Sequence, residues 1–190
     1  MSNVSNVLTE LHERYQRMYT DAGLLPRTDY IKEWDSPCYS GSVEGEEISW
    51  QPIVQQPPLD FSNVEDALAL TIHKDLKDFF AGFWAGDLQV RFRDLSFTLL
   101  QVQSQQDAER LQQNLIGHVL MKQRLKQNVT LFFGVGIEDD LMLSMNNATG
   151  AIGLEYAGKE PHVVLTGDLS SFLMEVEPVV LDQSEGAVTF

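Results

Sequence analysis

The chain has 190 residues, of which 28 are acidic and 13 are lysine or arginine, so its formal net charge is −15. The length and a hydrophobic fraction of 43% suit one domain with its own core and exclude a disordered chain. The acidity argues against nucleic-acid binding, which needs a basic face, and against direct docking on anionic lipid, but it permits a basic protein partner.

Sorting signals and cysteine content point to the cytosol. The N-terminus has no basic region followed by an apolar run, so we expect no signal peptide. No stretch approaches the roughly 20 apolar residues of a membrane-spanning helix. Cys38 is the only cysteine, which rules out an internal disulfide and suits a reducing compartment.

The first part of the chain contains one clear helix pattern. Apolar residues at three- and four-residue spacing predict an amphipathic helix over residues 3–21. Residues 24–39 show no period and are expected to form an ordered loop. We expect an exposed turn over residues 41–47 and a short strand over 48–51, which ends at a proline.

A second helix is predicted to begin at the sequence Ser62-Asn63-Val64-Glu65, which has the form of a capping box. Apolar residues continue from there at four-residue steps as far as Phe80, so the pattern predicts one helix over this stretch.

Residues 84–126 are predicted to form the frame of the fold. Leu88, Val90 and Phe92 alternate with polar residues, which is typical of a half-buried strand. Asp94 marks a turn, and residues 97–102 form a more apolar second strand. A long helix follows with Ser104 as its N-cap. Its last turns carry three cations, which the helix dipole favours there: Lys122, Arg124 and Lys126.

The remaining chain alternates strands and turns and then ends in a helix. Strands are expected at 129–135, 141–145, 151–156 and 163–165. Asp168 is expected to cap a helix over 169–177. Short turns between successive strands favour a single mixed or mostly antiparallel sheet with helices packed against it, an α+β fold. We therefore predict one domain over residues 1–180 and a frayed tail over 181–190.

Charge is distributed unevenly along the chain. Residues 1–60 have a net charge of −6, residues 61–127 of 0, and residues 128–190 of −9. If the two acidic flanks fold over one side of the neutral frame, their charges sum into one field that attracts cations.

The residues give little support to catalysis. Cys38 with His73, His118 or His162 as base would make a thiol nucleophile, but nothing in the pattern brings them together, and a buried thiol is the simpler interpretation. His118 is expected to be structural. We find no nucleotide motif and no metal-site spacing, so no cofactor, metal or small-molecule substrate is expected.

Asp87 is the one carboxylate that the residues alone single out. It follows Ala85 and Gly86 at the start of a strand, and these short neighbours would leave it open. The pattern is equally compatible with a turn cap and with a contact for a cation.

Several ungapped words occur in an order that resembles the Syd family of SecY-interacting proteins. They are Ala85-Gly86-Asp87, Phe97-Thr98-Leu99-Leu100-Gln101, Asn114-Leu115-Ile116-Gly117-His118, Lys122-Gln123-Arg124-Leu125-Lys126 and Thr130-Leu131-Phe132, with Ser36-Pro37-Cys38 and Trp50-Gln51-Pro52 upstream. The resemblance covers about residues 5–180.

The resemblance implies an α+β fold related to the SMI1/KNR4 superfamily and no enzymatic activity. It also implies a cytosolic protein held at the cytoplasmic face of the inner membrane by SecY, whose basic loops enter a concave acidic surface and whose assembly it monitors. Asp87 lies in a matched word and is the first candidate contact. Glu33, Asp35, Glu65 and Asp66 are further candidates because they precede or begin elements beside the frame. Two alternatives stay open, a thiol hydrolase using Cys38 and an acidic immunity protein that neutralises a cationic toxin.

Overall fold

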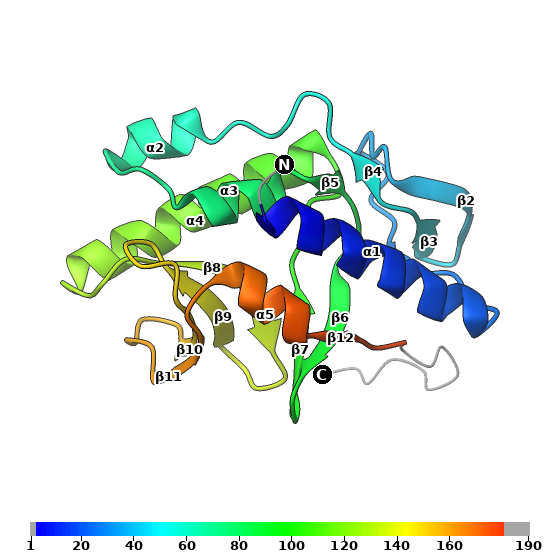
Figure 1. Cartoon of the computed structure of the whole chain (residues 1–190). Helices are drawn as coiled ribbons and strands as arrows, with labels where there is room; N and C mark the ends of the chain where they lie inside the picture. Colours follow the sequence, from blue (N-terminus) through cyan, green and yellow to red (C-terminus); the bar gives the residue numbers. More distant parts are fainter. Residues whose placement is uncertain (1–2, 181–190) are drawn as a thin grey trace.

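The computed structural model describes residues 3–180 and has an antiparallel sheet of seven strands at its centre (Figure 1). These strands are β6 (Leu88–Phe92), β7 (Leu95–Leu99), β8 (Thr130–Gly136), β9 (Leu141–Asn146), β10 (Ile152–Tyr156), β11 (Val163–Thr166) and β12 (Glu177–Pro178). Their order across the sheet is β11-β10-β9-β8-β7-β6-β12. Every neighbouring pair is antiparallel, which confirms the predicted α+β class.

Two small sheets lie beside the large one. Strands β1 (Arg27–Asp29), β2 (Tyr39–Glu44) and β3 (Glu47–Trp50) form one in the order β1-β3-β2. Strands β4 (Ile53–Val54) and β5 (Phe83–Trp84) form the other. The predicted loop and exposed turn before residue 48 are therefore partly wrong, because β1 and β2 both pair with β3.

The helices are α1 (Asn3–Asp21), α2 (Ser62–Leu68), α3 (Lys74–Phe80), α4 (Gln105–Arg124) and α5 (Leu169–Glu175). Helix α1 packs against α3 and α5, and α4 packs against β8 and α2. Arg14 ties α1 to the end of α5 by donating from Nη1 to the carbonyl oxygen of Val176 over 3.2 Å. No helix within residues 3–180 is long and apolar enough to cross a membrane.

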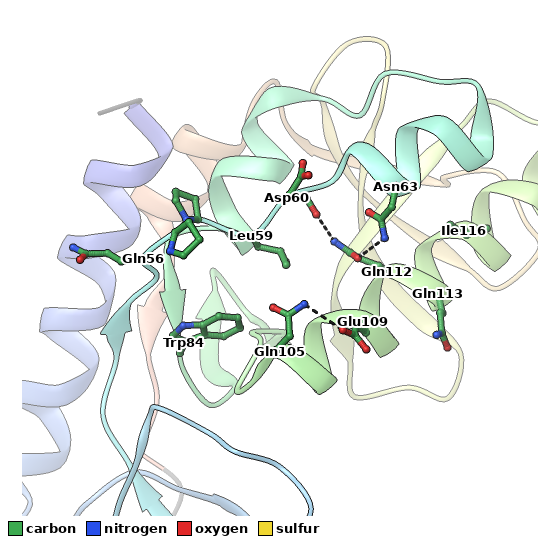
Figure 2. A pocket seen from close by; sticks show the side chains of 12 residues that line it. Gln56, Leu59, Asp60, Asn63, Trp84, Gln105, Glu109, Gln112, Gln113 and Ile116 are labelled. Carbon is green, nitrogen blue, oxygen red and sulfur yellow. Dashed lines mark hydrogen bonds between the residues drawn. The ribbon is translucent and has the colours of Figure 1, made fainter.

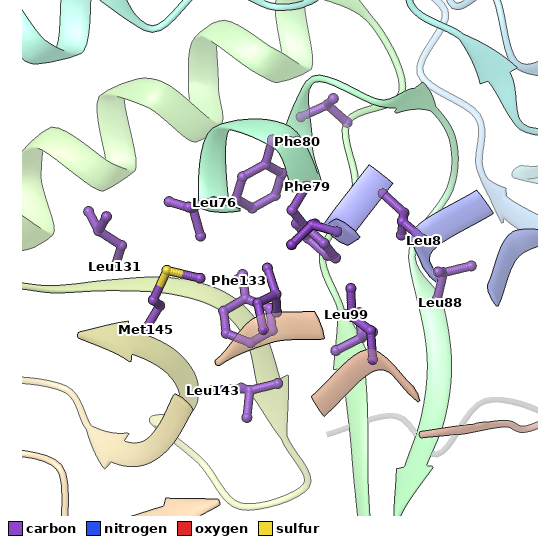
Figure 3. Packing of buried hydrophobic residues seen from close by; sticks show 14 of the residues in the cluster. Leu8, Leu76, Phe79, Phe80, Leu88, Leu99, Leu131, Phe133, Leu143 and Met145 are labelled. Atoms are coloured by element: carbon purple, nitrogen blue, oxygen red, sulfur yellow. The ribbon is translucent and has the colours of Figure 1, made fainter. Parts of the chain in front are cut away.

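The core lies between the sheet and the helices, and Figure 3 shows the part where residues of α1 and α3 meet the strands. Leu88, Val90 and Phe92 are fully buried, as their alternation predicts. The ring of Phe79 on α3 meets the ring of Phe133 on β8 edge to face, with centroids 5.5 Å apart. Such aromatic contacts add to the burial of apolar area and fix how the helix sits on the strand.

The predicted single helix over residues 62–80 is wrong, because the chain forms two helices there. Ala69 adopts a left-handed conformation (φ 48°) that ends α2, and α3 starts five residues later. The capping box is also absent. Ser62 donates its hydroxyl to Asp60, and Glu65 accepts the Ile72 N–H and the Lys77 ammonium. Glu65 thus joins the two short helices across the break.

Lys122 lies in the last turns of α4, as predicted, but it also belongs to a buried ion pair. Its side chain is fully buried, and Nζ donates to Glu155 Oε2 over 3.0 Å and to the Lys159 carbonyl over 2.7 Å. The other oxygen of Glu155 accepts from Thr130 and lies 3.2 Å from His118 Nε2. These partners hold the pKa of Glu155 below its ordinary value although burial alone would raise it. His118 is therefore structural, as predicted.

Candidate partner-binding surface

Asp87 lies in a hollow rather than on the open surface, and it is not the exposed carboxylate that its short neighbours predict. Gly86 packs so closely on Trp50 that a Cβ built there would lie 2.5 Å from the indole nitrogen. This contact draws the chain inward just before Asp87. The Asp87 Oδ1 atom accepts the backbone N–H of Gln101 over 2.7 Å. Burial raises the pKa of Asp87 to about 7, against the opposing effect of the Gln101 N–H.

We call this site the Asp87 hollow. Its volume is about 250 Å³, and its walls include Trp34, Gln101, Gln103, Asp107, Arg110 and Phe132. Burial also raises the pKa of Asp107, although the Gln103 N–H and the Arg110 charge oppose this. The negative charge of Asp107 in turn disfavours ionisation of Asp87. Two carboxylates that disfavour each other's ionisation favour a cation between them.

The charge distribution suggested that the two acidic flanks would supply the carboxylates of one field. Both carboxylates of the Asp87 hollow come instead from the neutral central third of the chain. Several acidic side chains of the C-terminal third make hydrogen bonds elsewhere. Glu138 accepts the Tyr156 hydroxyl, Glu160 accepts the Asn128 N–H, and Asp168 caps α5. These side chains do not line the Asp87 hollow.

The other predicted contacts divide into two groups. Glu33 and Asp35 are exposed on the loop that carries Trp34 into the wall of the Asp87 hollow. Glu65 and Asp66 belong to α2 and do not line the hollow. Asp66 is exposed, whereas Glu65 is half-buried and paired with Lys77, with 2.7 Å between the charged atoms. The structure therefore places the loop of Glu33 and Asp35, but not α2, beside Asp87.

A second, larger hollow lies on the opposite flank of α4, and we call it the Trp84 hollow (Figure 2). Its volume is about 570 Å³, and its walls include Pro57, Leu59, Asp60, Trp84, Gln105 and Glu109. At 3.6 residues per turn, Gln105, Glu109, Gln112 and Ile116 share one flank of α4, and Asp107, Arg110, Leu111 and Asn114 share the other. The first half of α4 is thus a ridge between two hollows.

Sequence patterns did not single out the residues that complete both hollows. Asp107 and Glu109 both lie at the start of α4 and differ only in the helix face they occupy. Helical periodicity alone would have assigned these two residues to different faces of the helix. The positions of Trp34 and Trp84 could not be predicted in this way, because both reach α4 from distant segments.

Cys38 is buried, as the simpler interpretation predicts, and burial raises the pKa of its thiol to about 11. Its sulfur contacts the Ser36 hydroxyl and the Gln103 carbonyl oxygen. Within residues 3–180, the rings of His73, His118 and His162 make their contacts elsewhere, with Asp75, Thr130 and Tyr156. A nucleophilic cysteine needs a lowered pKa and an adjacent base, so this geometry does not favour thiol chemistry. No group of three or more histidine, cysteine or acidic side chains in the described part of the chain is arranged to hold a metal ion.

Taken together, the fold and the two hollows define an acidic α+β protein in which two hollows flank one helix and carry carboxylate and aromatic side chains. Residues 5–178 match the family model described as Syd protein (SUKH-2). The chain therefore belongs to the Syd family.

Curated relatives agree with this assignment. The protein Syd of Pseudoalteromonas atlantica is 35% identical over 95% of this chain and 99% of the relative. The protein Syd of Idiomarina loihiensis is 42% identical over 80% and 84%, and that of Alteromonas mediterranea is 45% identical over 79% and 83%.

Proposed function

We propose that this protein binds basic cytosolic loops of SecY without catalysing a reaction, and that a cationic side chain of the loop enters the Asp87 hollow. The observation that carries the proposal is the pair of carboxylates, Asp87 and Asp107, both held in one hollow at a raised pKa. A cation placed between them relieves the burial of both charges.

The hollow also has the shape and lining that a single long side chain requires. Its volume of about 250 Å³ admits one lysine or arginine side chain. The ring of Trp34 offers an aromatic wall against which a cation is stabilised. Arg110 already occupies this wall in part, with Cζ 5.4 Å from the ring centroid.

Exposed acids around the hollow add long-range attraction. Glu33 and Asp35 flank Trp34, and Asp66 on α2 is a further candidate contact at greater distance from the hollow. Together with the net charge of −15, these acids raise the rate at which a basic loop is captured. We expect the capture to weaken as salt rises, because the screening length falls to about 10 Å near 0.1 M salt.

Binding of this kind places the protein at the cytoplasmic face of the inner membrane through its partner. A loop that is folded into an assembled translocon presents its cations differently from one that is exposed. We infer that the protein distinguishes these two states, so its role is to monitor SecY assembly.

The test is capture of purified SecY by the immobilised protein at rising salt, comparing wild type with Asp87→Asn and with the double variant Glu33→Lys/Asp35→Lys. Asp139→Lys is the control, since it reverses an exposed acid in the turn before β9. We expect Asp87→Asn and the double variant to lose most of the capture, and Asp139→Lys to keep it. Capture that is indifferent to salt and to Asp87 would refute the proposal. Tight capture of a cationic toxin domain in place of SecY would favour the immunity alternative.

A further inference from the structure

The Trp84 hollow contains the components of an arginine site. Figure 2 shows the indole ring of Trp84 pointing into the hollow, with Leu59 on one side and Gln105 on the other. Asp60 and Glu109 line it, and the Glu109 carboxylate accepts from the side-chain amide of Gln105 over 3.3 Å. Hydrogen bonds from the Ser62 hydroxyl and N–H hold the pKa of Asp60 below its ordinary value, so this carboxylate is charged at neutral pH.

The walls of the Trp84 hollow are fixed without a ligand. The buried amide of Gln55 donates to the carbonyl oxygens of Phe80 and Phe83 and accepts the Leu59 N–H over 2.9 Å. Gln112 on α4 donates to the Asp60 carbonyl oxygen over 2.7 Å and accepts from the side chain of Asn63 over 3.0 Å. These bonds hold the segment of residues 55–63 against α4, so a ligand that binds loses little free energy in ordering the hollow.

The other flank of α4 shows what fits between a tryptophan and a carboxylate in this protein. Arg110 lies over the ring of Trp34, and its charge opposes the rise in the pKa of Asp107 that burial causes. The Trp84 hollow offers the same kinds of group, an indole ring with carboxylates nearby, but the α4 residues that line it are uncharged apart from Glu109. A guanidinium is planar, stacks on an indole and binds a carboxylate through two parallel N–H groups.

We propose that the Trp84 hollow binds an arginine side chain of the same basic segment whose next cation enters the Asp87 hollow. This inference rests on the proposed function and specifies its ligand. The outward face of α4 between the hollows carries Gln106 and Gly117, with Gln113 at the edge of the Trp84 hollow and Arg110 at the edge of the Asp87 hollow, and a Cβ at Gly117 would meet nothing within 4 Å. A helix about 10 Å wide is crossed by three to four extended residues. The segment therefore carries its arginine about four positions from the second cation.

The two side chains are distinguished by chemistry as well as spacing. A lysine ammonium carries its charge at one point and has no plane to stack, so the Trp84 hollow selects arginine over lysine. We expect a preference of about five-fold, which is the scale of one cation–π contact at a partly exposed site.

The test uses two synthetic peptides, Arg-Gly-Ser-Gly-Lys and Lys-Gly-Ser-Gly-Lys, each capped at both ends and titrated into the full chain at low salt by calorimetry. Wild type is expected to prefer the arginine peptide. Trp84→Leu is expected to reduce the ratio of affinities to about 1, whereas Glu109→Gln should weaken both peptides and keep part of the preference. Trp34→Leu is the matched control on the other flank and is expected to weaken both peptides equally. Trp84→Phe keeps a flat ring and should keep part of the preference if Trp84→Leu fails to fold.

Equal affinities in wild type, or a preference that survives Trp84→Leu, overturn the inference. Absence of measurable binding by both peptides also overturns it, and SecY capture then decides the proposed function separately. If SecY capture ignores Asp87 while the arginine preference persists, the proposed function fails and the arginine site stands.

Discussion

Replacing Asp87 by asparagine is expected to stabilise the protein at alkaline pH. The amide keeps an oxygen that accepts the Gln101 N–H but removes a charge that is costly to bury. The rise in the pKa of Asp87 from 3.8 to about 7 corresponds to about 4 kcal/mol, at about 1.4 kcal/mol for each tenfold change in proton affinity. Water that reaches the carboxylate through the hollow reduces this figure, so we expect about 2–3 kcal/mol.

The sign of the effect follows from the proton balance. Between about pH 4 and pH 7 the folded wild type holds a proton on Asp87 that the unfolded chain has lost. Its stability therefore falls as pH rises through this window, and the full cost is present above pH 7. The asparagine variant lacks this contribution.

Urea unfolding of both proteins at pH 5, 6, 7 and 8 measures the difference. We expect the free energy of unfolding of the variant, relative to that of wild type, to rise at each pH step and to level off above pH 7. Parallel stability curves, or a variant that is less stable at pH 8, would refute the conclusion that folding raises the pKa of Asp87. Loss of SecY capture in the same variant would mean that stability is sacrificed for binding at this position.

Three further predictions concern the interior. Lys122→Met should destabilise the protein by about 3–5 kcal/mol in chemical unfolding, because Glu155 is left buried without its cation. Adding Glu155→Gln should restore much of the lost stability. A double variant whose loss of stability equals the sum of the two single losses would contradict the pairing. Gly86→Ala should cost about 1–3 kcal/mol because its methyl group meets the Trp50 indole, whereas Gly117→Ala on the open face of α4 should add about 0.5–1 kcal/mol in the same thermal scan. Equal effects of the two changes would argue against the Trp50 contact. Cys38 should react with a thiol reagent at pH 7.5 far more slowly than in the urea-unfolded chain, because its pKa is about 11; rapid labelling of the native protein would reopen the hydrolase alternative.

Local patterns predict most of the regular structure. The alternation at Leu88, Val90 and Phe92 identifies β6, and Ser104 caps α4 by accepting the Asp107 N–H over 3.1 Å. Both depend on neighbours in sequence. The break between α2 and α3 was not predictable in this way. Alanine favours helix, yet Ala69 is left-handed and ends α2, and the two helices pack on different partners, α2 on α4 and α3 on α1.

The candidate site was less predictable for the same reason. The sequence singled out Asp87, but the environment of its carboxylate depends on Gln101, which follows β7, and on Trp50, which belongs to a separate sheet. The pKa of a carboxylate depends on such distant partners and not on its sequence neighbours. The segment 181–190, predicted to be frayed, lies outside the described residues.

The attachment of α1 to α5 and β12 has a consequence for synthesis on the ribosome. Helix α1 can pack on α3 as soon as that helix is made, but its contacts with α5 and β12 wait until Val176 and the residues after it have been translated, because Arg14 and its neighbours bind there. Strand β6 likewise has one unpaired edge until Glu177 and Pro178 have been made. Part of the apolar face of α1 and one edge of β6 therefore stay open until residues 176–178 have emerged, and chaperones have most opportunity to act during that interval.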